Sequence, residues 1–245
     1  MSFIRKIISS HSKEDVQLYN ELKILLNFSP RKINKYKKAF THRSVQMLDR
    51  KGIPINYERL EFLGDSILGS IIAAYLYKKV PEGSEGYLTQ MRSKIVSREH
   101  LNELGKDLNL IRFVKSNVDQ ANVGDNIHGN IFEALIGAIY LDKGHNACQK
   151  FIYNNVIVPY VDIEKLEGKI TSYKGLIIEW CQKQKKKYIF DSYEDSGNET
   201  IKHFSVKISI DGKQIAKGRA TSKKKAEEQA SKRVYFTFQK QIDSV

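Results

Sequence analysis

The chain has 245 residues, of which 41% are hydrophobic and 28% are charged, with 15 glycines and 4 prolines. This composition can build a folded core and excludes a disordered or collagen-like chain, and the length allows one large domain or two small ones. The 41 Lys and Arg against 28 Asp and Glu leave a net charge of +13, which indicates a polyanionic partner, either nucleic acid or an anionic membrane surface.

The cysteine spacing, the N-terminal residues and the apolar runs indicate the cellular compartment. Cys148 and Cys181 lack CxxC spacing, so we expect neither a structural zinc site nor a disulfide framework. Arg5 and Lys6 interrupt the apolar residues at the N-terminus, which therefore does not resemble a signal peptide. The longest apolar run, 68–77, has ten residues against the ~20 that span a bilayer. These features predict a cytoplasmic protein with no membrane partner.

Helical periodicity dominates the first two thirds of the chain. Apolar residues recur at i, i+3 and i+4 in the segments predicted as helices, which are Val16–Leu26, Asn56–Lys79, Tyr87–Ser97, Arg98–Leu108 and Asn130–Lys143. We expect an all-α domain over 1–161. The polar and charged residues of 162–171 then indicate a linker.

Beyond the linker the pattern changes to helix, three strands and helix, predicted over 172–183, 188–193, 203–210, 213–220 and 222–239. Asp211-Gly212 between the last two strands is a strong hairpin signal. A small α+β domain of αβββα order is therefore expected over 172–245. Residues 1–167 carry a net charge of +5 and residues 168–245 a net charge of +8, so the basicity is concentrated in this second domain.

The helix over 56–79 carries an acidic face. Glu58, Glu61 and Asp65 follow i, i+3, i+7 spacing and share one side, opposite an expected core stripe of Leu60, Leu63, Ile67, Ile71 and Ala74. The carboxylates could be the solvated side of an amphipathic helix. However, Phe62 and Leu68 lie among them, so the helix is apolar nearly all round, as buried helices are. Like charges on a buried face need a cation such as Mg²⁺, which prefers oxygen ligands, and both interpretations remain open at this point.

Four further polar residues are candidates for a functional site. Asn130 and Glu133 open an almost wholly apolar helix at i, i+3 spacing. Glu85 lies in the turn segment 81–86 and by itself is more typical of a solvated loop acid. His42, in AFTHRS, could be catalytic, but the stronger interpretation is a hydrogen-bonded residue of the scaffold.

The motif ERLEFLGDS (58–66) resembles the signature of the ribonuclease III family at every constrained position. The similarity continues in order with AFTHRS (39–44), EGYLTQMRSKIVS (85–97) and NIFEALIGAIYLD (130–142), and covers about 15–160. It implies an all-α endonuclease domain that dimerises and cuts double-stranded RNA with Mg²⁺, which Mn²⁺ can replace. It also implies 5′-phosphate products, a role in ribosomal and messenger RNA processing, and no small-molecule substrate.

The resemblance also implies site residues. Glu61, Asp65, Asn130 and Glu133 fall on the metal-binding positions, and the catalytic positions fall on Asp65, Glu133, Glu58 and Glu85. Phe62 has two readings, a core aromatic or a side chain inserted across the dimer interface, and its place among the carboxylates favours the second. The family most often has Asp where this chain has Asn130. We expect the lost negative charge to weaken metal binding, with activity retained.

The C-terminal segment, with TSKKKA at 221–226, resembles a double-stranded-RNA-binding domain over about 172–240. The resemblance places Lys223, Lys224 and Lys225 on phosphates, and Glu179 and Gln182 in the minor groove. In the first strand loop Gly197 matches, but Asn198 and Thr200 replace the family's Pro and His, so we expect this loop to contribute less to RNA binding and the lysines to contribute more. The run KQKKK at 183–187 could be ordinary solvation or an added phosphate contact.

The leading hypothesis is therefore a homodimeric, Mg²⁺-dependent endoribonuclease for double-stranded RNA. A catalytically weak protein that binds duplex RNA is the alternative, motivated by Asn130. A membrane-surface protein is poorly supported, because no basic amphipathic helix carries an aromatic apolar face.

Overall fold

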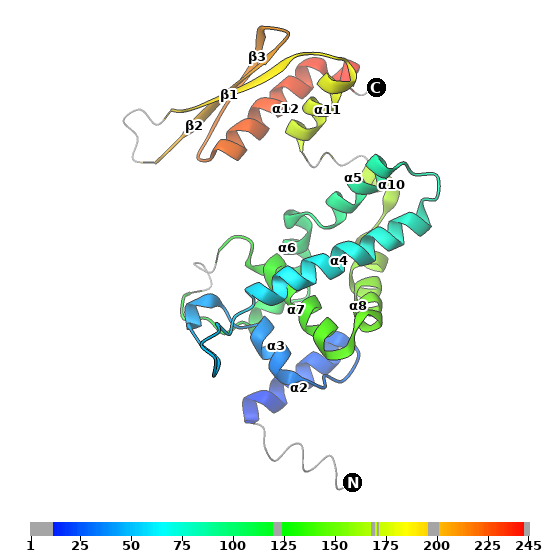
Figure 1. The fold of residues 1–245 in the computed structure, drawn as a ribbon, viewed down its shortest axis with the longest axis vertical. Coiled ribbons are helices and arrows are strands. Elements are labelled where there is room, and N and C mark those ends of the chain that lie inside the picture. The colour runs from blue at the N-terminus through cyan, green and yellow to red at the C-terminus, as the bar shows by residue number, and fades with distance from the viewer. Residues whose placement is uncertain (1–11, 120–123, 168–169, 171, 196–200, 243–245) are drawn as a thin grey trace. The chain divides into compact units, whose positions relative to one another are not determined.

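The computed structural model describes residues 12–119, 124–167, 170, 172–195 and 201–242. They form two compact units, Met1–Gly168 and Lys169–Val245, and each is described by itself (Figure 1).

The regular secondary structure in the described part of the first unit is helical, apart from the isolated β-bridges Thr41–Lys115 and Leu48–Pro54 (Figure 1). Its α-helices are α2 (Lys13–Leu26), α3 (Ile33–Ala39), α4 (Glu58–Lys79), α5 (Glu85–Ile95), α6 (Arg98–Asp107), α7 (Ile127–Lys143), α8 (His145–Ile152), α9 (Val158–Tyr160) and α10 (Ile163–Glu167). Two 3₁₀ turns, η1 (Arg43–Val45) and η2 (Leu110–Phe113), and the π-helical turn η4 (Tyr153–Ile157) complete it. Ser84 and Ser97 are the N-caps of α5 and α6, each accepting a backbone N–H with its side chain.

Helix α7 is the centre of this domain. It is apolar nearly all round and has eleven buried residues, and α3, α4, α6 and α8 all pack against it. Its C-terminal end is anchored by Asp142, whose buried carboxylate accepts hydrogen bonds from the backbone N–H groups of Arg31 and Lys32 at 2.9 and 2.8 Å and from the Tyr36 hydroxyl at 3.0 Å. These three donors fix α7 against the start of α3.

Helices α4 and α7 cross at two glycines. A Cβ added at Gly64 would lie 1.7 Å from the Glu133 carbonyl oxygen, and one at Gly137 would lie 2.3 Å from the Leu60 carbonyl oxygen. Only glycine permits backbones to approach this closely, and the crossing brings the acidic face of α4 beside Glu133 of α7.

The buried stripe of α4 differs from the predicted one. Its members are Leu60, Gly64, Leu68, Ile71, Ile72 and Leu76, whereas Ala74 is exposed and Leu63 and Ile67 are only partly buried. The reason is the glycine crossing, which turns the Gly64 side of the helix toward α7. By length and composition α4 could cross a membrane, but here it is the helix that packs most extensively on α7.

The segment expected as a linker, 162–171, contains helix α10. The ammonium of Lys94, which is 5% exposed, donates to the carbonyl oxygens of Leu166 and Glu167 at 2.7 and 3.0 Å. The Tyr87 hydroxyl donates to the Glu167 carboxylate at 2.5 Å. These contacts hold α10 on α5, so residues 163–167 belong to the first unit.

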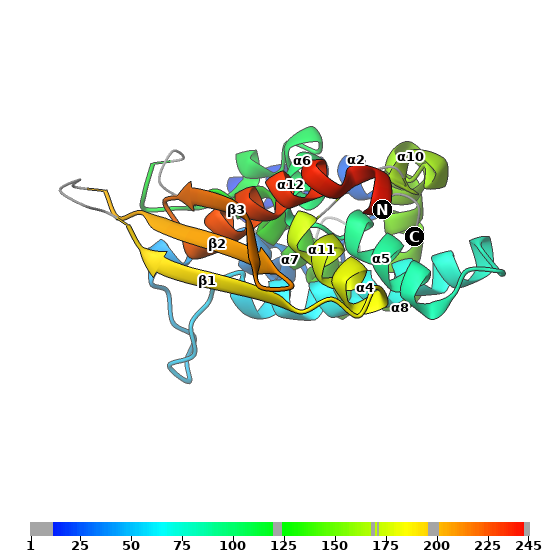
Figure 2. The same cartoon turned by 90° about the horizontal axis from the view of Figure 1, so that it is seen from above.

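The second unit is a three-stranded antiparallel sheet with helices α11 (Tyr173–Lys183) and α12 (Lys223–Ile242) (Figure 2). The strands β1 (Tyr188–Glu194), β2 (Phe204–Ile210) and β3 (Lys213–Ala220) lie in the order β1-β2-β3. The predicted αβββα order is confirmed. Asp211 and Gly212 both have positive φ, 49° and 78°, which is the backbone of the predicted hairpin turn.

One face of this sheet is covered by α12, and α11 packs beside α12. Ile177 and Trp180 of α11, Val206 and Ile208 of β2, and Ala226, Ala230 and Val234 of α12 make up the centre of its core. A Cβ at Gly218 of β3 would lie 2.4 Å from the Ala226 carbonyl oxygen, so glycine sets the close approach of strand and helix.

Candidate active site and nucleic-acid interface

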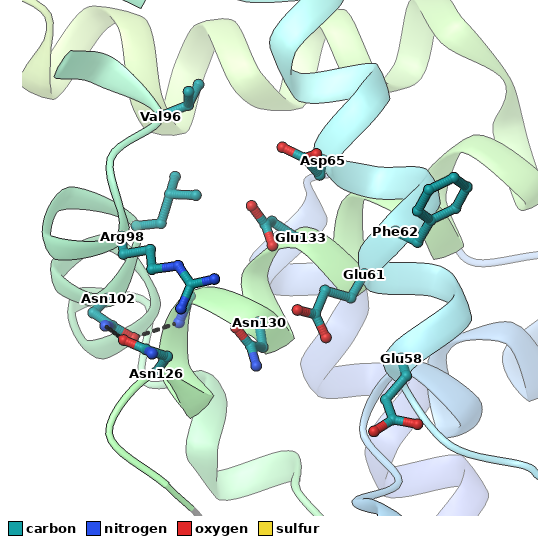
Figure 3. Close-up of a pocket in the computed structure, with 12 residues that line it drawn as sticks. Glu58, Glu61, Phe62, Asp65, Val96, Arg98, Asn102, Asn126, Asn130 and Glu133 are labelled. Atoms are coloured by element: carbon teal, nitrogen blue, oxygen red, sulfur yellow. Dashed lines mark hydrogen bonds between the residues drawn. The ribbon is translucent and has the colours of Figure 1, made fainter. Parts of the chain in front are cut away.

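A cavity of about 580 Å³ lies beside the crossing of α4 and α7 (Figure 3). Its lining brings together five residues that the sequence predicted for the site, namely Glu58, Glu61, Asp65, Asn130 and Glu133, together with Phe62. In Figure 3 Glu133 of α7 lies beside Glu61 and Asp65 of α4, and Arg98 lies opposite these carboxylates.

The α4 side carries three carboxylates. Glu58 accepts a hydrogen bond from the Asn56 amide at 3.1 Å and pairs with Arg43 at 3.7 Å. Glu61 is partly buried, and its pKa is raised by burial and by the charges of Glu58 and Asp65. Asp65 is exposed, so the acidic face opens into a solvent-accessible cavity and not into the apolar core. The acidic face is thus neither fully buried nor fully solvated, because the burial of α4 falls on its Gly64 side.

Glu133 is the most buried carboxylate of the site. Burial, and then the charges of Asp65 and Glu61, raise its pKa to about 8, while Arg98 opposes the shift. It lies nearly two turns inside α7, because α7 begins at Ile127 and not at Asn130 as predicted. A buried carboxylate next to two others is destabilised by their charges and would be stabilised by a cation.

Asn130 lines the cavity on α7, one helical turn before Glu133, and lies next to Tyr57. Burial raises the pKa of Tyr57, and its interaction with the Asn130 side chain lowers this pKa in part. A side-chain amide can ligate a cation through its carbonyl oxygen.

These residues fit a hard divalent cation by their chemistry. Three carboxylates and an amide oxygen are the ligand types that Mg²⁺ takes, usually with several waters retained. Among the described residues, no three acidic, His or Cys side chains are already grouped tightly enough to hold an ion. Rotation of Glu61, Asp65 and Glu133 about their side-chain bonds would be needed for them to converge on one.

The opposite wall of the cavity was not predicted from the sequence. It is built by Arg98 and Asn102 of α6 and by Asn126, which precedes α7. The Asn102 carbonyl oxygen accepts from the Gly129 backbone N–H at 2.8 Å, and its amide donates to Asn126 at 3.2 Å. In the sequence, Arg98 and Asn102 are distinguished only by their i, i+4 spacing on one helix, and this spacing alone does not indicate a functional site.

Other predicted residues lie outside the cavity or at its rim. Glu85 begins α5, where its carboxylate accepts a hydrogen bond from Thr89 at 3.0 Å. Phe62 is at the rim with 78% of its surface exposed, and its ring points away from the carboxylates (Figure 3). The reading of Phe62 as a core aromatic is therefore wrong. His42 is buried and bonded to Ser44 at 2.8 Å, as a scaffold residue would be.

The second unit presents its predicted residues on two helices. Lys223, Lys224 and Lys225 are exposed in the first turn of α12, and Ser222 caps this helix by accepting from the Lys225 N–H at 3.3 Å. Glu179 and Gln182 are exposed on α11, where Glu179 pairs with Lys183 at 3.4 Å. Gly197, Asn198 and Thr200 lie outside the described residues.

Comparison with known proteins agrees with this architecture. Residues 33–160 match the family model described as ribonuclease-III-like, and residues 173–235 match the double-stranded RNA binding motif. Ribonuclease 3 of Zunongwangia profunda is 63% identical over 243 residues, which cover 99% of this chain and 100% of that protein. Ribonuclease 3 of Flavobacterium psychrophilum is 62% identical over 244 residues, covering 99% of each.

Solved structures show the same helical domain. The crystal structure of the nuclease domain of ribonuclease III from Campylobacter jejuni is 29% identical, with a TM-score of 0.50 over 58% of this chain and 97% of that one. A second structure of the same domain, which describes flexibility in its dimer-forming region, is 28% identical with a TM-score of 0.50, over 57% of this chain and 96% of that one.

A helical nuclease domain followed by a domain that binds duplex RNA defines an endoribonuclease for double-stranded RNA. The chain belongs to the ribonuclease III family.

Restoring a carboxylate at position 130 tests the expected role of the amide. Asn130→Asp adds a negative charge whose oxygens face the cavity, so the Mg²⁺ concentration for half-maximal cleavage is expected to fall roughly three- to tenfold. A titration of cleavage rate against Mg²⁺ measures this. An unchanged or raised midpoint would contradict the role of Asn130 as a weak ligand.

Proposed function

We propose that the chain is a homodimeric, Mg²⁺-dependent endoribonuclease in which Glu61, Asp65, Asn130 and Glu133 hold the metal. The observation that carries this proposal is the convergence of the α4 carboxylates and Glu133 on one cavity, next to the exposed ring of Phe62. The unfavourable charge on Glu133 supports a cation there, with Mn²⁺ as a substitute of the same preference.

Mg²⁺ held by these residues would supply an activated water and would stabilise charge on the scissile phosphate. Asp65 is exposed at the cavity and is proposed to orient that water together with Glu133. Glu58 lies at one end of the acidic face, held by Asn56 and Arg43, and is proposed to position the substrate strand. Water adds to the phosphorus as the P–O3′ bond breaks, so one product carries a 5′-phosphate and the other a 3′-hydroxyl.

Phe62 supports the homodimer. A phenylalanine with 78% of its surface exposed is unfavourable in water, and burial in a partner would remove this cost. In such a dimer each protomer contributes one cavity, and we propose that each cavity cuts one strand of a duplex. Glu85, apart from the cavity of its own chain, is then proposed to contact substrate strands.

The second domain is proposed to hold the duplex through its phosphates and minor groove, using the lysines of α12 with Glu179 and Gln182 of α11. Domains of this kind read A-form shape across about 16 base pairs with little sequence preference. Ribosomal and messenger RNA precursors in the cytoplasm are the proposed substrates, and neither a small molecule nor a membrane is proposed as a partner.

The decisive experiment compares labelled duplex RNA with single-stranded RNA of the same sequence, in Mg²⁺ and in EDTA. We expect cleavage of the duplex alone, only with Mg²⁺, and its loss in Asp65→Asn. Glu82→Gln, in an exposed turn outside the cavity lining, is the matched control and should cleave normally. Duplex binding without cleavage at any Mg²⁺ concentration would refute the enzyme and favour the catalytically weak binding protein.

The lysines of α12 give a second prediction. Replacing Lys223, Lys224 and Lys225 by Ala removes three exposed charges from one helix turn, so duplex affinity is expected to fall, and the slope of log affinity against log salt to lessen by roughly 2–3. Binding measured at several salt concentrations checks this. The same three substitutions leaving the salt slope unchanged would show that the lysines are only solvated.

A further inference from the structure

Arg98 is a cation placed in an acidic cavity. It is the first residue of α6, directly after the cap Ser97, and its guanidinium points into the space in front of Glu133 and Asn130 (Figure 3). It lowers the pKa of both Glu61 and Glu133 against the effect of their burial, so its charge acts on two proposed metal ligands.

The position of Arg98 argues against a role limited to neutralising the carboxylates. An arginine that served only to neutralise the carboxylates would be expected to lie in contact with one of them. Arg98 instead remains exposed on the wall opposite α4, and it forms no ion pair within 4.0 Å with another side chain in the described part of the chain. A cavity of about 580 Å³ separates the two walls.

The base of Arg98 is held firmly relative to the carboxylates. Asn102 of α6 bonds the Gly129 N–H of α7 at 2.8 Å. At Gly105 of α6 an added Cβ would lie 2.2 Å from the His128 carbonyl oxygen, so α6 and α7 touch along their backbones. The position of Arg98 across from Glu133 is therefore set by helix packing and not by a loop.

We propose that Arg98 binds a non-bridging oxygen of the scissile phosphate, facing the metal-binding carboxylates across the cavity. A guanidinium offers paired N–H donors that match phosphate oxygens, and such charge-assisted bonds are stronger than neutral ones. The phosphate then has a cation on each side. This inference rests on the proposed function, since it names a further substrate-contacting residue of the same site.

The proposal predicts a pair of effects, on Mg²⁺ binding and on the cleavage rate, that a purely charge-balancing role for Arg98 does not predict. A cation beside a metal site opposes Mg²⁺ binding, so removing Arg98 should tighten Mg²⁺ binding by roughly two- to fivefold. Removing a phosphate ligand should at the same time slow cleavage at saturating Mg²⁺ by about 10- to 100-fold. A side chain that merely balanced charge would leave the saturated rate unchanged or raise it.

The test uses the full chain with Arg98→Ala, Arg98→Gln and Arg98→Lys. Lys106→Ala, an exposed cation at the other end of α6, is the matched control. Mg²⁺ affinity is measured by the rise in melting temperature with added Mg²⁺, without RNA. Single-turnover cleavage of duplex RNA is measured at saturating Mg²⁺. We expect Ala and Gln to lose rate and gain Mg²⁺ affinity, Lys to recover part of the rate, and Lys106→Ala to match the wild-type protein.

A saturated rate unchanged in both Arg98→Ala and Arg98→Gln, with the wild-type protein active, would overturn the inference and leave the proposed function standing. Failure of the wild-type protein to cleave would instead contradict the proposed function. Arg98 is exposed, and the Gln variant keeps much of its aliphatic stem, so melting curves without Mg²⁺ should show folded protein for both.

Discussion

Replacing Glu133 by Gln is expected to abolish duplex cleavage and, without metal, to make the protein more stable. Glu133 combines burial with the charges of Asp65 and Glu61, so its ionised form is unfavourable in the folded chain. The amide keeps the shape and removes the charge. Lewis-acid stabilisation supplies several kcal/mol, and loss of about 4 kcal/mol corresponds to a ~10³-fold lower rate.

The stability effect has a definite pH dependence. The pKa of Glu133 is raised from 4.5 to about 8 in the folded metal-free protein. Its contribution to stability is therefore fully present below about pH 4.5 and is lost as the pH rises through about 8. The melting temperature of Glu133→Gln in EDTA should exceed that of the wild-type protein at pH 8–9, and the difference should shrink toward pH 5.

Adding Mg²⁺ should reverse the order, because it stabilises the wild-type protein and has little effect on Glu133→Gln. Glu82→Gln, which removes one charge outside the cavity lining, should follow the wild-type protein at each pH and Mg²⁺ concentration. Equal melting temperatures for Glu133→Gln and wild type at pH 9 in EDTA would show that the three carboxylates do not interact as described.

Gly64→Ala is expected to damage both stability and cleavage although it adds a single methyl group. The new Cβ would lie 1.7 Å from the Glu133 carbonyl oxygen, a backbone atom that no side-chain rotation can move. Helices α4 and α7 must therefore separate. Overpacking of this kind costs about 3 kcal/mol or more, which lowers the melting temperature of a domain of this size by roughly 6–12 °C.

The same displacement moves Asp65 away from Glu133, so Mg²⁺-dependent stabilisation should weaken and cleavage should fall by at least ~10²-fold. Gly69→Ala is a matched control on the same helix, because its Cβ would meet nothing within 4 Å. It should keep full activity and gain about 0.5–1 kcal/mol. Thermal melts and cleavage assays on both variants decide the matter, and equal behaviour of the two would contradict the role of the helix crossing.

The sequence predicted local structure well where a single residue or pair determines it. Asp211-Gly212 predicted the hairpin turn, because this turn depends on the neighbouring backbone alone. The periodicity of 56–79 predicted a helix but misplaced its buried stripe. Which side of an apolar helix is buried depends on its partner, and here the Gly64 crossing with α7 selects it.

The acidic half of the site was recognisable because Glu58, Glu61 and Asp65 lie on one helix. The other wall was not, since Arg98 joins Glu133 only through the packing of α6 on α7. Nothing in the local sequence around Arg98 shows that its side chain reaches a cavity. Helix α10 within 162–171 was missed for a similar reason, because Lys94, some 70 positions earlier, stabilises its last carbonyl groups.

The hydrogen bonds to Asp142 fix the C-terminal end of α7 along the helix axis. Glu133 lies nine residues before Asp142 on α7, about 13 Å away along the helix axis. Any axial slip of the helix would break the bonds from Arg31, Lys32 and Tyr36 at the same time. The alignment of a carboxylate with a phosphate is thus set partly at the start of α3, and substitutions there would alter the chemistry without approaching the substrate.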